Sequence, residues 1–121
     1  MSRPLLHQQK MIEVVRQAAV ETGIFPLGDL RVRAYLARDY SIGDGDPSLA
    51  FVALSLALAQ GRPAATRAEA GAYIFKALEA AMAPAFAAGP LALSFEVREV
   101  EADSSFKSNT VHAALAARSK P

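Results

Sequence analysis

The sequence predicts an α/β (α+β) fold that is built as a duplicated βαβ. Two observations support this prediction. The segments read helix, strand, strand, helix and strand along the 121 residues, and the two joints between a helix and a strand resemble each other. The first joint reads PLGDLRVR from residue 26, and the second reads PLALSFEVR from residue 90. We expect one domain, 1–121, with halves at about residues 1–48 and 49–121.

The first half is predicted to contain a helix, a strand and a loop. Residues 4–22 carry apolar side chains at helical spacing, with Ser2 as the expected N-cap, Pro4 in the first turn and Gly23 as the stop. Residues 29–38 alternate between apolar and polar side chains, which predicts a strand. The following segment, SIGDGDP, consists almost entirely of turn residues and is predicted as a loop.

The second half is predicted to be strand, helix and strand. Residues 49–59, LAFVALSLALA, are apolar on both faces, a pattern that helices and buried strands share. The turn-rich segments on either side favour a buried strand. Residues 64–88 read as an amphipathic helix that Pro84 kinks or ends, and residues 91–100 read as another strand. The residues from Glu101 onward are predicted to form a tail that begins polar.

The first half lacks a strand that the second half contains. A duplicated βαβ therefore needs a further strand before Ser2. Parallel strands are normally paired on both sides, and each buried backbone group without a partner costs about 1–3 kcal/mol. We expect either that another chain fills this gap or that the natural protein begins upstream of Met1.

Composition argues against several classes of function. The formal net charge is +1, so nothing favours nucleic acid or an anionic membrane as a partner. The sequence has no cysteine, which excludes disulfides and thiolate catalysis, and two distant histidines make no metal motif. Asp44 and Asp46 are interpreted as turn residues rather than a calcium loop. The first 23 residues are too charged for a secretory leader, and the cytoplasm is the expected location.

Several motifs occur in a fixed order along the chain. Residues 21–33 read ETGIFPLGDLRVR, residues 39–46 form an acidic, glycine-rich loop, and AFV at residue 50 precedes the pair Gly61-Arg62. Residues 92–97 read ALSFEV and residues 105–112 read SFKSNTVH. This series resembles the 5-carboxymethyl-2-hydroxymuconate isomerase family of the tautomerase superfamily. That family carries TGIFPL-x-x-IR-x-R, an ADG loop, an AFV strand closed by GR, ALSFEI and FK-x-N-x-x-H.

The resemblance implies a tautomerase-like duplicated βαβ, with a four-stranded sheet backed by two helices and assembled as a homotrimer. It implies an isomerase that shifts a proton and a double bond in an unsaturated 2-hydroxy or 2-oxo dicarboxylate such as 5-carboxymethyl-2-hydroxymuconate. Such a step belongs to aromatic catabolism, in the degradation of 4-hydroxyphenylacetate through homoprotocatechuate. No cofactor and no metal are implied.

Family members begin with a strand whose first residue, after removal of methionine, is a proline. The secondary amine of that proline is the catalytic base. Pro4 is an internal amide in this chain and has no basic nitrogen, so it cannot replace that base. The strand that carries the proline is therefore the strand expected upstream.

Arginines are the expected ligands of the substrate. The reaction needs cations that hold carboxylates and stabilise negative charge on oxygen, and the planar guanidinium group does both. By resemblance, Arg31 and Arg62 are catalytic and bind the substrate, and Arg33 and Phe51 also contribute to substrate binding. From the residue pattern alone, Arg31 and Arg33 would be the solvated face of a strand, and Phe51 a core or pocket-wall residue.

The two histidines are expected to have structural positions rather than catalytic ones. His7 is expected on a helix surface, and His112 is expected to make a structural hydrogen bond. The alternative function is a catalytically inactive, oligomeric homologue that binds carboxylates and lacks the proline base, because a fold alone does not guarantee activity. An upstream Met-Pro joined in frame favours the isomerase, and an in-frame stop favours the alternative. A purely structural protein has only composition in its favour.

Overall fold

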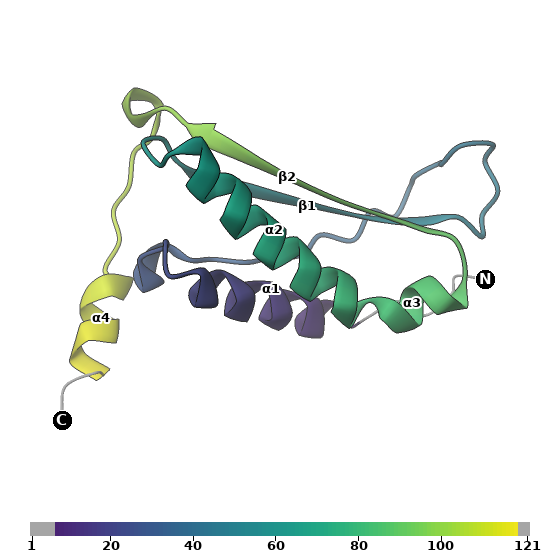
Figure 1. The fold of residues 1–121 in the computed structure, drawn as a ribbon, viewed down its shortest axis with the longest axis horizontal. Coiled ribbons are helices and arrows are strands. Elements are labelled where there is room, and N and C mark those ends of the chain that lie inside the picture. Colours follow the sequence, from purple (N-terminus) through teal and green to yellow (C-terminus); the bar gives the residue numbers. More distant parts are fainter. Residues whose placement is uncertain (1–6, 119–121) are drawn as a thin grey trace.

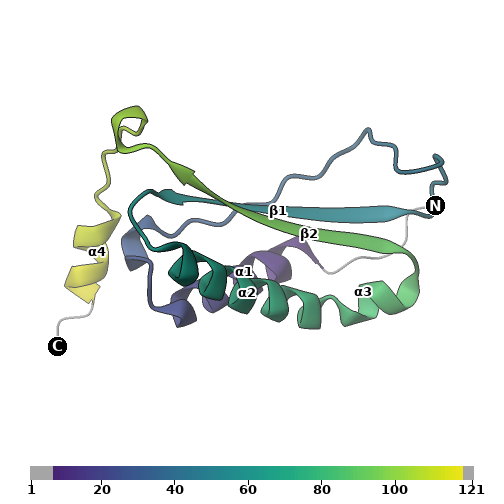
Figure 2. The ribbon, with the colours of Figure 1, turned by 45° about the horizontal axis from the view of Figure 1, so that its top comes forward.

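The computed structural model describes residues 7–118 and shows helices packed on one face of a sheet (Figure 1). The order of the elements is α1 (Gln8–Thr22), the 3₁₀ helix η1 (Leu27–Asp29), β1 (Ala50–Ala59), α2 (Ala64–Ala81), α3 (Ala83–Ala88), β2 (Leu91–Val100), the 3₁₀ helix η2 (Ala102–Ser104) and α4 (Val111–Arg118). Figure 2 shows α1 and α2 side by side beneath β1 and β2. The predicted α/β class is confirmed.

The sheet formed by the described residues has two parallel strands, β1 and β2. Ala50 pairs with Leu91 and Ala59 pairs with Val100, so the two strands match along their whole length. Burial alternates along both strands, because every second side chain points toward the helices. The predicted strand, helix and strand of the second half are thereby confirmed.

The core lies between the helices and the inner face of the sheet. Ile74, Leu78 and Met82 are the largest fully buried side chains. Ala18 and Ala19 of α1 are buried beside them, and their small side chains allow α1 to lie close to α2. This core holds the sheet, both helices and the connection after α1 in one body.

Helix α1 begins later than predicted. It starts at Gln8, and the exposed His7 is its N-cap, accepting a hydrogen bond of 3.2 Å on Nδ1 from the N–H of Gln9. The predicted N-cap Ser2 and the first-turn Pro4 lie outside the described residues. The predicted stop is confirmed, because Gly23 adopts a left-handed conformation with φ 74° and its N–H bonds to the carbonyl of Val20.

The predicted helix over residues 64–88 is divided into two. Helix α2 ends at Ala81, and α3 begins at Ala83 with Pro84 in its first turn. Proline is tolerated there because the first helical N–H groups have no partner within the helix. Pro84 therefore ends one helix and starts another, as its position in the sequence predicted.

The prediction of a strand over residues 29–38 is wrong for this structure. The segment runs alongside β1 in Figures 1 and 2, but it forms no ladder with the described residues. The backbone at Leu30 is extended, with φ −84° and ψ 115°. Tyr35 is 82% exposed and Leu36 81%. An alternating pattern becomes a strand only when a neighbouring strand supplies hydrogen bonds, so two of the four implied strands are formed within residues 7–118.

The tail contains a helix that the sequence analysis did not predict. Helix α4 has only eight residues, four of which are alanine, and it packs beside η1 at one end of the molecule (Figure 1). Isolated helices of this length are marginal in water, so α4 depends on its contacts with the rest of the chain.

Candidate active site

Arg62 lies in the turn between β1 and α2, where its guanidinium group joins two parts of the chain. Its Nη2 donates a 3.0 Å hydrogen bond to the carbonyl oxygen of Ile24, and its Nη1 donates a 3.2 Å bond to that of Ala59. The guanidinium carbon also lies 5.4 Å from the centroid of the Phe25 ring, a cation–π contact. The turn carrying Arg62 is thereby held against the connection between α1 and η1.

A second set of polar contacts fixes the same turn from the other side. The Glu99 carboxylate accepts from the N–H of Gly61 at 3.3 Å and pairs with Arg67 at 3.4 Å. Arg67 also donates to the main-chain carbonyl of Arg62. These contacts bring together the ends of β1 and β2 and the beginning of α2. The backbone of Arg62 is therefore restrained, which favours a preorganised cation.

Arg31 and Arg33 occupy the segment that follows η1. Both side chains are exposed. Arg33 lies over the Tyr35 ring at 5.7 Å, whereas the guanidinium of Arg31 makes no ion pair or hydrogen bond with any residue in 7–118. An exposed guanidinium without a partner can bind a carboxylate with two parallel hydrogen bonds.

The structure brings Arg31 and Arg62 to the same end of the molecule. Ile24 and Phe25, the contacts of Arg62, lead through η1 directly into Arg31. Two cations that approach one region from different elements can hold the two ends of a dicarboxylate or stabilise an oxyanion.

Phe51 is not part of that cluster. It is the second residue of β1, whereas Arg62 follows the far end of the strand. Eight residues from Phe51 to Ala59 span roughly 26 Å at the usual rise per residue. Phe51 is 40% exposed and makes an edge-to-face contact with Tyr40 at 5.6 Å. Within one chain, Phe51 and Arg62 therefore do not line the same site.

Two residues of the tail contact the turn that precedes Arg31. Asn109 Nδ2 donates to the carbonyl of Gly28 at 2.8 Å, and His112 Nε2 lies 3.0 Å from Asp29 Oδ1. The structural hydrogen bond predicted for His112 is confirmed. Asn109 was not singled out from the sequence, although it belongs to the same SFKSNTVH motif.

Other kinds of site find little support in the described part of the chain. Among residues 7–118, no group of three or more histidine, aspartate or glutamate side chains is arranged to hold a metal ion. In the same range, no helix combines the length and apolar character needed to cross a bilayer. Asp44 and Asp46 accept hydrogen bonds from nearby main-chain N–H groups, as expected of turn residues.

Comparison with known proteins agrees with the motifs and the fold. The model of the 5-carboxymethyl-2-hydroxymuconate isomerase family matches residues 4–115. A 5-carboxymethyl-2-hydroxymuconate Delta-isomerase from Escherichia coli is 34% identical over 99 residues, which cover 82% of this chain and 79% of that protein.

Two solved structures share the fold. The first, a 5-carboxymethyl-2-hydroxymuconate isomerase from Deinococcus radiodurans R1, is 29% identical with a TM-score of 0.82, covering 88% of this chain and 81% of its own. The second is a 5-carboxymethyl-2-hydroxymuconate delta-isomerase that is 26% identical with a TM-score of 0.82. The match covers 91% of this chain and 83% of the chain in that structure. The chain belongs to the 5-carboxymethyl-2-hydroxymuconate isomerase family.

Proposed function

We propose that the protein is an isomerase that shifts a proton, and with it a double bond, in an unsaturated 2-hydroxy or 2-oxo dicarboxylate. The substrate we propose is 5-carboxymethyl-2-hydroxymuconate, the compound that appears in the names of the family and of the relatives. The observation that supports the proposal is the hydrogen bond of Arg62 to Ile24, which joins the turn carrying Arg62 to the connection that leads through η1 to Arg31. The carboxylates of such a substrate need cationic contacts, and the isomerisation of its dienol needs a further group that accepts and donates protons.

The arginines divide the work of binding and stabilising charge. In our proposal, Arg31 binds a substrate carboxylate through its exposed guanidinium group. Arg62 uses the N–H groups that remain after its bonds to Ile24 and Ala59 to stabilise an oxyanion. Arg33 adds positive charge on the same segment, next to Tyr35. None of these groups can act as the base, because arginine remains protonated.

The base in this proposal is the secondary amine of an N-terminal proline that is carried on a further strand of the fold. An α-amino group titrates near pH 7.7–8.0, and an apolar, cationic site lowers that pKa further toward neutrality. The unpaired extended segment after η1 supports the proposal, because an added strand would offer it a ladder partner. The proline amine would accept the proton of the substrate 2-hydroxyl group and deliver a proton to a carbon of the dienol, so that the double bonds shift and a 2-oxo product forms.

We further propose that the working assembly is a cytoplasmic homotrimer with the site between subunits. The outer face of the sheet is exposed and carries mostly small side chains, among them Ala53, Ala57 and Ser94, which would allow a second sheet to approach closely. Phe51 lies on this face, at the end of β1 far from Arg62. It would therefore line a site completed by the arginines of a neighbouring subunit.

An absorbance assay of isomerisation tests the proposal. Two chains are compared, the present one and one that is preceded by an alternating strand with proline as its first residue. We expect turnover by the extended chain alone. Arg31→Ala in that chain should reduce kcat/KM about 10- to 100-fold, the loss expected for one charge-assisted hydrogen bond.

The matched control is Arg38→Ala, which removes an exposed arginine of the same segment that pairs with Asp39. It should leave kcat/KM unchanged. If both chains form the same oligomer and neither turns over, the isomerase proposal fails, and an inactive carboxylate-binding homologue becomes the better account.

A further inference from the structure

Side chains of the tail, the residues from Glu101 onward, contact the turn η1 that leads into Arg31. Asn109 is the anchor, because its side chain bonds in two directions. Its Nδ2 donates to the carbonyl of Gly28 at 2.8 Å, while its Oδ1 accepts from the N–H of Val111 at 2.8 Å. The second bond satisfies the first N–H of α4, and the first bond joins the start of that helix to η1. One side chain thereby couples the folding of α4 to the position of the turn.

His112, the second residue of α4, makes the other contact with η1. Its Nε2 lies 3.0 Å from Asp29 Oδ1, and its ring lies flush against the buried Gly28. A Cβ atom at Gly28 would lie 2.4 Å from Nδ1 of that ring. The glycine is therefore required by this close approach and not by its backbone conformation.

These contacts matter because the segment beyond η1 forms no β-ladder hydrogen bonds with other residues in 7–118. The position of the Arg31 backbone therefore depends on how η1 is held. Arg62 bonds to Ile24 before η1, and Asn109 of the tail bonds to Gly28 within it. Asp29, the last residue of η1, lies two positions before Arg31, and its carboxylate is the acidic group nearest to Arg31 in the sequence. The Asp29 carboxylate is therefore a natural competitor for the Arg31 guanidinium.

From these contacts we infer that Asn109 and His112 are positioning residues for Arg31. Asn109 holds η1 in place, and His112 engages the Asp29 carboxylate so that Arg31 is left to bind the substrate. The role of Arg31 rests on the proposed function, whereas the contacts of Asn109 and His112 with η1 are a property of the fold. The two claims can therefore be tested apart.

Amide hydrogen exchange of the present chain, without any substrate, tests whether Asn109 and His112 hold η1 in place. In His112→Ala and Asn109→Ala, we expect faster exchange over residues 27–33, where the N–H groups of Asp29 and Leu30 now bond to Pro26 and Leu27. Exchange in α2 should not change. Lys107→Ala, an exposed substitution in the same tail, is the control and should leave both regions as they are. Unchanged exchange over residues 27–33 in both variants would overturn the inference.

Kinetics of the chain with the N-terminal proline test the positioning role. His112→Ala should raise KM about tenfold with kcat little changed, because a contact made equally in the ground and transition states is lost. The double variant Asp29→Asn/His112→Ala should recover most of the KM, since it removes the competing carboxylate. His112→Gln, which keeps an N–H donor, should also recover it.

The outcomes separate a positioning role from a merely structural one. A KM that stays at the wild-type value in His112→Ala overturns the inference. So does a raised KM that Asp29→Asn fails to restore, because general loosening of the fold would not depend on the charge at residue 29. If the wild-type extended chain shows no turnover, the proposed function fails together with the claim about Arg31. The exchange result then still decides whether the tail holds η1.

Discussion

Arg62 donates a 3.0 Å hydrogen bond from Nη2 to the main-chain carbonyl of Ile24, a residue that lies 38 positions earlier in the chain. This bond joins the turn after β1 to the connection after α1. Arg62 therefore supports the fold as well as the chemistry proposed for it. For substitutions at this residue, both the free energy of unfolding and kcat/KM must be measured.

Replacing Arg62 should lower stability. Arg62→Ala removes two charge-assisted hydrogen bonds and a cation–π contact at a partly exposed position, and we expect a loss of about 1–3 kcal/mol in the free energy of unfolding. Denaturant unfolding measures this loss. Arg38→Ala, whose side chain is 91% exposed, should change stability by less than about 0.5 kcal/mol. Equal stability of both variants would show that the bond to Ile24 contributes nothing.

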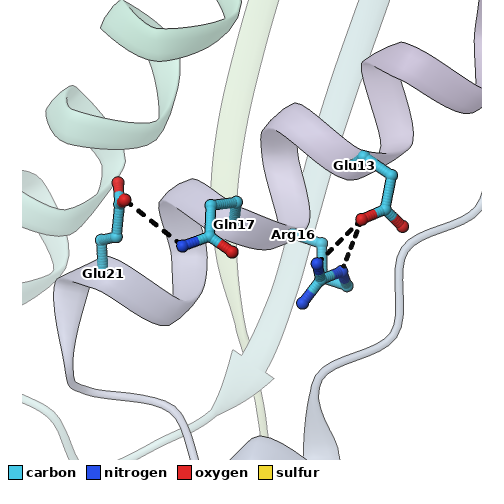
Figure 3. A network of polar contacts seen from close by, with 4 residues as sticks. All are labelled: Glu13, Arg16, Gln17 and Glu21. Atoms are coloured by element: carbon cyan, nitrogen blue, oxygen red, sulfur yellow. Dashed lines mark hydrogen bonds and ion pairs between the residues drawn. The ribbon is translucent and has the colours of Figure 1, made fainter.

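Removing the Tyr73 hydroxyl should change the titration of Glu21. Tyr73 donates a 2.6 Å hydrogen bond to the Glu21 carboxylate, which lowers the pKa of Glu21 and raises the pKa of Tyr73. In Tyr73→Phe, the pKa of Glu21 should therefore rise toward its ordinary value, as measured by NMR titration of the side-chain carboxyl carbon. The Glu13 carboxylate, whose pKa is lowered mainly by Arg16 on the same helix, is the internal control (Figure 3).

The sign of the accompanying change in stability follows from these directions. A carboxylate with a lowered pKa stabilises the fold above its unfolded pKa, and this contribution is lost as pH falls through the folded pKa. A tyrosine with a raised pKa stabilises the fold below its unfolded pKa, and this is lost as pH rises through the folded pKa. The stability difference between wild type and Tyr73→Phe should thus be largest near neutrality and shrink in acid. A difference that grows in acid would contradict this assignment.

Gly28→Ala should disrupt the contact between η1 and the tail. The new Cβ would lie 2.4 Å from His112 Nδ1, so the imidazole ring must move away from Asp29. We expect exchange over residues 27–33 to accelerate, as we also expect for His112→Ala. Gly23→Ala is the matched control, because its positive φ strains the end of α1 while nothing lies within 4 Å of the added Cβ. Slow exchange over residues 27–33 in Gly28→Ala would mean that the ring is readily displaced without loosening the turn.

The sequence analysis predicted those elements whose patterns are satisfied locally. The strands β1 and β2 and the helix between them follow from apolar patterning and from Pro84. The segment after η1 shows the limit of this reasoning, because its alternation is that of a strand while its ladder depends on a partner absent from residues 7–118.

Contacts between distant residues could not be predicted either. The bonds from Asn109 and His112 to η1 span 81 and 83 positions, and no local pattern encodes them. For the candidate site, the motifs singled out Arg31 and Arg62, but nothing in them indicated that Arg62 is bound to Ile24 or that Phe51 lies at the opposite end of β1.

We propose that this chain, when a strand with an N-terminal proline precedes it, isomerises an unsaturated 2-hydroxy acid by moving the hydroxyl proton to a carbon. The most direct test is NMR of 5-carboxymethyl-2-hydroxymuconate during turnover in D₂O. We expect one isomeric product, with deuterium at the carbon that gains the proton, formed about 10- to 100-fold more slowly in Arg31→Ala. Recovery of unchanged substrate, or of products formed by decarboxylation or hydrolysis, would contradict it.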